Sequence, residues 1–113
     1  MMTNLEKVAA WADGSQQITA AVELLIESGL LREQSAWIEH ESNGVRWVDF
    51  DNLPDRIGGL SGGEQRVALF AASLASSEVK ISLADVLYGL DRPRAVAVLK
   101  AAAAALGMAL TSS

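Results

Sequence analysis

Apolar residues recur every three to four positions along most of the chain, which predicts a largely helical protein. Residues 3–12 begin with Thr3 and Glu6 at the spacing of a helix-capping box. A second helix is expected after Ser15, with Gly29 just beyond its last turn. Its predicted inner stripe consists of Ile18, Val22, Leu25 and Ile26.

Three more helices are expected in the second half of the chain. They begin at Ser61, Ser82 and Asp91, which are residue types that accept a hydrogen bond from the first turn of a helix. The first of these helices runs to about residue 75, and the last ends at Gly107. In the last helix the predicted inner stripe consists of Val96, Leu99, Ala103 and Leu106.

The period changes to two in residues 36–50, on both sides of an Asn43-Gly44 turn. Asn-Gly between β-prone segments is typical of a two-residue type I′ turn, in which both residues have positive φ. This loop would pair Glu41 with Arg46, His40 with Trp47 and Trp37 with Phe50. The hairpin is expected to end near Pro54, because proline cannot donate to the ladder. The sequence therefore predicts an α+β fold, a mostly helical single domain (1–113) with about five helices and one β-hairpin.

Charge and composition narrow the classes of protein to which the chain can belong. The 113 residues carry 9 basic and 14 acidic side chains, a formal net charge of −5, and only residues 79–113 have more bases than acids. The absence of cysteine excludes disulfides and thiolate metal sites. No apolar segment reaches the roughly 20 residues that span a bilayer, and the N-terminus lacks the pattern of a signal peptide. We therefore expect a cytoplasmic protein without a membrane partner.

Residues 57–69, IGGLSGGEQRVAL, resemble the signature segment of ABC-type ATPases, in which LSGGE or LSGGQ precedes QRV and an apolar helix. Residues 81–91 are similar to the Walker B and D-loop segments of that family, so the resemblance covers residues 57–91. Glycine amides and the helix N-terminus favour an anion in such a segment. The resemblance therefore implies a phosphate contact through Ser61, Gly62 and Gly63.

The chain departs from the ATPase pattern at the positions that perform the chemistry. Ala84 stands where the family has its magnesium-binding aspartate, and Asp85 stands where it has its catalytic glutamate. No Gly-x-x-x-x-Gly-Lys-Ser/Thr segment occurs in the chain. The only histidine, His40, alternates along its strand with the neighbouring acids, whose side chains point to the opposite face. No catalytic, cofactor or metal site is therefore expected, and a capping box from Ser61 to Glu64 accounts for the serine and glycines.

The whole chain also resembles small proteins of high-GC bacteria and their phages. These proteins share an aromatic and acidic hairpin, the LSGGE helix start and a closing GLD-R helix. The resemblance implies one small domain and no particular activity.

Two functions follow from features of the hairpin and of the helix that begins at Ser61. The first is a non-enzymatic interaction or regulatory protein, which recognises a protein partner or a second copy through the hairpin side chains Trp37, Trp47 and Phe50. We favour this function. The second is a phosphate- or nucleotide-binding module that uses Ser61, Gly62 and Gly63.

A third function is a DNA-binding regulator. The helices that begin at Ser82 and Asp91 are arranged along the chain like a helix-turn-helix, whose second helix enters the major groove. The cations on that second helix are Arg92, Arg94 and Lys100. The net charge of −5 opposes nucleic-acid binding unless these residues form a separate basic face.

Overall fold

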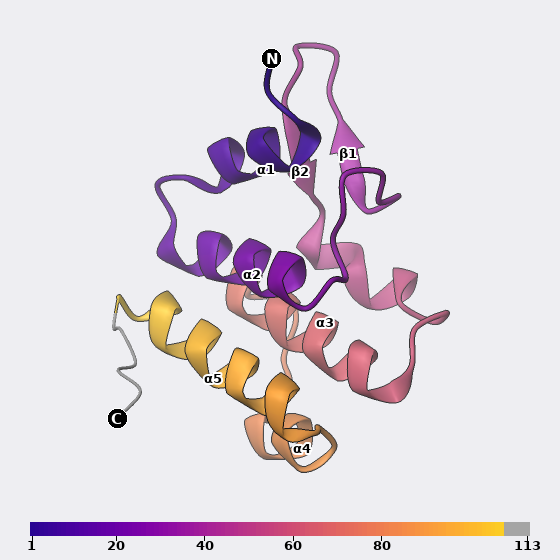
Figure 1. Cartoon of the computed structure of the whole chain (residues 1–113), viewed down its shortest axis with the longest axis vertical. Coiled ribbons are helices and arrows are strands. Elements are labelled where there is room, and N and C mark those ends of the chain that lie inside the picture. Colours follow the sequence, from indigo (N-terminus) through magenta and orange to yellow (C-terminus); the bar gives the residue numbers. More distant parts are fainter. Residues whose placement is uncertain (108–113) are drawn as a thin grey trace.

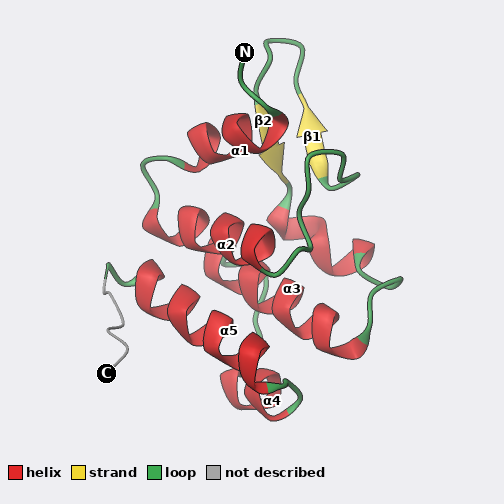
Figure 2. Cartoon of the chain, viewed as in Figure 1, coloured by secondary structure: helices red, strands yellow, loops and turns green. Residues whose placement is uncertain are grey.

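The computed structural model describes residues 1–107. Its α-helices are α1 (Asn4–Ala12), α2 (Gln16–Glu27), α3 (Gly62–Ala75), α4 (Leu83–Tyr88) and α5 (Arg92–Ala105). The strands β1 (Ile38–His40) and β2 (Arg46–Val48) form an antiparallel hairpin, which is followed by a 3₁₀-helix, η1 (Phe50–Arg56). The expected α+β, mostly helical single domain is thus confirmed (Figure 2).

Helix α2 lies between α1 and α5 (Figure 1). Helix α3 packs across α2 and α5, and the short α4 packs on α3 beside the start of α5. The hairpin stands next to α1, at the opposite end of the longest axis from α4 (Figure 1). None of the helices within residues 1–107 has the length and apolar character needed to cross a bilayer.

Local side chains begin the helices where the sequence predicts. Thr3 Oγ1 accepts the Glu6 backbone N–H at 3.1 Å, and the Glu6 carboxylate accepts the Thr3 N–H at 3.1 Å. Ser61 and Glu64 form the same reciprocal pair at α3. The caps of the other α-helices are Ser15, Ser82 and Asp91.

The loop between α2 and β1 connects three parts of the fold. Gly29 has a φ of +76° and ends α2, and Leu31 is buried in the core. The Glu33 carboxylate accepts the backbone N–H groups of Asn4 and Leu5 at the start of α1. This second cap of α1 depends on a residue about thirty positions away, so no local pattern in the sequence predicts it.

The core combines a few large side chains with many alanines at helix contacts. Leu24 and Leu25 are fully buried in α2, whereas Ile26, which the periodicity placed inward, is 36% exposed. Because α1, α3 and α5 surround α2, its buried arc is wider than one stripe and is centred away from Ile26. Small residues let these helices approach closely. The buried alanines are Ala12, Ala20, Ala21, Ala68, Ala71, Ala72, Ala101, Ala103 and Ala105.

The predicted hairpin exists, but its predicted register is wrong by one residue. Gly44 has a φ of +90°, whereas Asn43 does not have a positive φ, so the loop is not a type I′ turn. The Gly44 N–H donates to the Glu41 carbonyl at 3.1 Å, and the Glu41 N–H donates to the Val45 carbonyl at 3.0 Å. This is a three-residue loop with a glycine bulge. The resulting pairs are Ile38 with Val48, Glu39 with Trp47 and His40 with Arg46.

The predicted pair of Trp37 with Phe50 is also wrong. The strands contain only three residues each, and Phe50 already belongs to η1, which the sequence analysis missed. Pro54 lies inside η1, where its missing N–H is tolerated because the helix is short. The predicted ion pair of Glu41 with Arg46 does not form, and instead Arg56 in η1 binds Glu39 in β1 at 2.8 Å.

The predicted inner face of α5 is wrong as well. Val96 and Leu99 are each 43% exposed and Leu106 is 75% exposed, although Ala103 is buried. The other buried residues of the helix are Val98, Ala101 and Ala105, which lie on its opposite side. Alanine lines both sides of this helix, so the periodicity alone does not select a face. The close approach to α2 selects the side with the small residues.

Candidate functional site

Ser61, Gly62 and Gly63, the predicted phosphate-binding residues, lie at the start of α3. Ser61 Oγ accepts the Glu64 backbone N–H at 3.2 Å, and a Glu64 carboxylate oxygen accepts the Ser61 N–H at 3.0 Å. The carboxylate of the protein itself therefore occupies the end of the helix at which a phosphate would bind. This geometry supports the capping-box interpretation of the LSGGE segment.

Two arginines lie against the glycines of this helix start. A Cβ atom on Gly63 would be 3.3 Å from Arg94 Nη1, and one on Gly62 would be 3.4 Å from Arg66 Nη1. Arg94 also forms an ion pair with Asp91 at 3.6 Å. The structure thus brings Arg94, one of the predicted nucleic-acid residues, to the predicted phosphate site. The Glu64 carboxylate already caps that site, and Asp91 already pairs with Arg94.

The capping box of α3 makes a specific contribution to the pH dependence of stability. The hydrogen bonds from Ser61 hold the pKa of Glu64 below its ordinary value of 4.5, and Arg94 and Arg32 lower it further. Because the folded state has the lower pKa, this stabilisation is present above pH 4.5 and is lost as the pH falls through the folded pKa. We expect Glu64→Gln, which keeps a hydrogen-bond acceptor, to lower the melting temperature at pH 7.

The difference in melting temperature between the wild type and Glu64→Gln should shrink steadily below pH 4.5. Circular dichroism melts from pH 3 to pH 7 measure this difference. The capping box of Glu6 is also weakened by acid, but it is common to both proteins and cancels. A difference that stays constant with pH would contradict a role for the carboxylate charge.

The three cations predicted to bind nucleic acid do not form one face of α5. At about 100° per residue, Lys100 is rotated roughly 80° and Arg94 roughly 160° from Arg92 around the helix axis. Arg92 and Lys100 are exposed, whereas Arg94 is turned toward α3. Lys100 lines a cavity of about 200 Å³ together with Glu23 and Glu27 of α2. The geometry therefore does not favour a continuous basic surface for DNA.

The aromatic residues of the hairpin are only partly accessible. Trp37 and Trp47 are half-buried, and Phe50 is 5% exposed and belongs to the core, which removes it as a surface anchor. Trp11 of α1 lies at the centre of the aromatic cluster, with its ring 6.1 Å from that of Trp47 and 6.5 Å from that of Phe50. The Trp47 Nε1–H also donates to the Glu41 carboxylate at 2.8 Å.

An open groove lies between α1 and the tip of the hairpin. Its cavity measures about 510 Å³, and its lining residues are Met2, Lys7, Ala10, Trp11, Asn43, Gly44 and Val45. The side chains of Met2 and Val45 are 48% and 38% exposed. The sequence analysis missed this site because its walls come from segments about 35 residues apart. The available signal was the spacing of Lys7, Ala10 and Trp11, which places them on one side of a helix.

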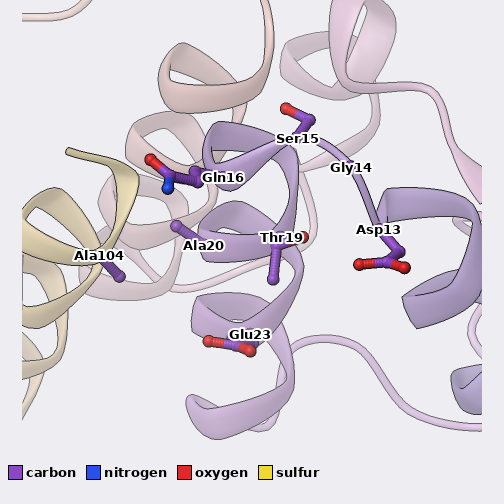
Figure 3. A pocket seen from close by; sticks show the side chains of 8 residues that line it. All are labelled: Asp13, Gly14, Ser15, Gln16, Thr19, Ala20, Glu23 and Ala104. Carbon is purple, nitrogen blue, oxygen red and sulfur yellow. The ribbon is translucent and has the colours of Figure 1, made fainter. Parts of the chain in front are cut away.

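A second cavity, of about 370 Å³, lies between the turn from α1 to α2 and the end of α5 (Figure 3). The Thr19 hydroxyl in its wall donates to the Ala12 carbonyl at 3.1 Å. Figure 3 shows the carboxylates of Asp13 and Glu23 on either side of Thr19, not directed toward one another. Carboxylates that are not directed toward a common point do not form the centre of a hard-cation site. We assign no ligand to this cavity.

Neither metal-binding geometry nor comparison with known proteins assigns a further functional site. Within residues 1–107, no group of three or more His, Asp or Glu side chains is arranged to hold a metal ion. Comparisons of the chain with protein-family models, curated proteins and solved structures find no match. The functional argument therefore depends on the groove and on the surface of the helices.

Proposed function

We propose that this protein is a cytoplasmic, non-enzymatic interaction protein, which binds a segment of a protein partner in the groove between α1 and the hairpin. The observation that carries the proposal is the cavity of about 510 Å³ with Trp11 in its wall. A cavity of roughly 300–1,000 Å³ is large enough to bury most of a side chain or a small ligand. The groove is open to solvent, so a segment of chain can enter it.

The anchor in the groove is held in place before binding. The Trp11 ring stacks on Phe50 at an interplanar angle of 16° and contacts Trp47 on another side. Phe50 is itself fixed in the core. A side chain that is already ordered loses little conformational entropy on binding, and tryptophan is enriched among the residues that dominate binding energy.

The charge of the groove indicates the chemistry of the partner. Lys7 is the one charged residue in the lining, and it takes part in neither of the two ion pairs formed within residues 1–107. An apolar side chain inserted beside Trp11 would leave a neighbouring carboxylate within reach of Lys7. The proposed ligand is therefore a peptide segment with a large apolar residue next to an aspartate or glutamate.

Selection of displayed random 12-residue peptides on the full chain tests this proposal. We expect the enriched peptides to pair a large apolar residue with an acidic one. We expect Ala10→Arg, which fills the groove from an exposed position on α1, to weaken their affinity by at least about tenfold. Isothermal titration calorimetry measures the change.

A matched variant at the other end of the molecule serves as the control. Val96→Arg places the same charge on the exposed side of α5 and should leave peptide affinity unchanged. Selection without a consensus, or peptides that bind equally well to the Ala10→Arg protein, would overturn the proposal.

A further inference from the structure

Helix α5 exposes its largest apolar side chains and buries its smallest. Val96 and Leu99 are 43% exposed and Leu106 is 75% exposed, while Val98 and several alanines contact α2 and α3. The exposed side chains follow one another along the outer side of a single helix. Contiguous apolar surface of this kind is typical of an interaction site.

The spacing of this outer stripe is that of a helix-packing seam. Val96, Leu99, Ala103 and Leu106 are separated by three, four and three residues, as the a and d positions of a heptad are. Ala103 is 9% exposed and forms the low point between its larger neighbours. A second helix could therefore pack its side chains between those of α5.

The stripe is also symmetric about its centre. If a second α5 runs antiparallel, Val96 faces Leu106 of the other copy, and Leu99 faces Ala103. Each pair is formed twice, which is the requirement for a two-fold symmetric interface. The large Leu99 side chain then meets the small Ala103, so the two surfaces can interdigitate.

We infer that two copies of this chain associate through antiparallel packing of their α5 helices. The charges of the helix select this direction. Parallel packing would place the two Arg92 side chains next to each other, whereas antiparallel packing separates them by about 27 Å, well beyond the screening length of physiological salt. Lys100 lies nearer the symmetry axis, but its side chain lines a cavity together with Glu23 and Glu27 of its own chain.

The size of the surface sets the strength of the association. Four side chains bury much less than the roughly 800 Å² per partner of a standard interface. We expect a dissociation constant of roughly 10–100 µM.

Sedimentation equilibrium of the full chain at low to high micromolar concentrations tests the inference. The wild type should pass from monomer to dimer over this range. Leu99→Asp should weaken the dimer by at least about tenfold, because it places two carboxylates in the seam. Val45→Asp, a matched change at a similarly exposed residue of the hairpin, should leave the association unchanged.

A charge exchange tests the direction of packing. Val96→Glu alone should weaken the dimer, and addition of Leu106→Lys should restore it, because the new glutamate then faces the new lysine in both halves of an antiparallel pair. In a parallel pair the same double variant would place like charges together. A wild type that stays monomeric at 500 µM, about fivefold above the expected range, overturns the inference. So does a dimer that Leu99→Asp leaves intact, or one that the double variant fails to restore.

This association is independent of peptide binding, because the groove and α5 lie at different ends of the molecule (Figure 1). Variants of the groove should not alter sedimentation, and variants of α5 should not alter peptide affinity.

Discussion

Replacement of Phe50 by alanine is expected to lower the free energy of unfolding by about 3–5 kcal/mol. Phe50 is 5% exposed, and its ring stacks on Trp11 at 6.5 Å. The substitution removes the buried ring, leaves a cavity at the start of η1 and takes away one of the two supports of Trp11. Chemical denaturation followed by circular dichroism measures the loss.

The same experiment separates a core role for Phe50 from a role as a surface anchor. Tyr88→Ala removes an aromatic ring that is 89% exposed and should change stability by less than about 0.5 kcal/mol. If Phe50→Ala also cost less than about 1 kcal/mol, its placement in the core would be wrong. Because Phe50 supports Trp11, its loss should also weaken peptide binding in the groove.

The helix starts could be predicted because each depends on residues three positions apart. Ser61 and Glu64 fulfil a capping box wherever the rest of the chain lies, and the same holds for Thr3 and Glu6. The LSGGE segment shows the limit of such local reasoning. Its sequence is compatible with a phosphate site and with a helix cap, and the cap forms from the chain alone.

The hairpin could be predicted in position but not in register. Asn43 and Gly44 are compatible with a two-residue loop and with a three-residue loop, and the two loops pair the strands in registers that differ by one residue. That choice follows from the packing of Ile38 and Val48 into the core and of Trp47 against Trp11. It therefore depends on α1, which is far away in the sequence.

The groove could not be predicted because it exists only where α1 meets the tip of the hairpin. Lys7 and Trp11 belong to one segment, and Gly44 and Val45 to another. The tryptophans of the hairpin belong to the same end of the molecule as the groove. In the proposed complex, however, the anchor is Trp11, on the helix that packs against the hairpin.

The orientation of α5 leads to the prediction with the largest expected effect. Val98→Asp is expected to lower the free energy of unfolding by about 4 kcal/mol or more, because Val98 is 0% exposed and a short side chain cannot carry its carboxylate to solvent. This is a large fraction of the roughly 5–15 kcal/mol that stabilises a domain of this size. Leu99→Asp, at the next residue, should cost less than about 1 kcal/mol when measured at a few micromolar, where the proposed dimer is dissociated. The two variants share the cost of an aspartate inside a helix, so their difference isolates burial. The reverse order of effects would mean that the stripe of Val96, Leu99 and Leu106 faces the core, and the surface proposed to join two copies would not exist.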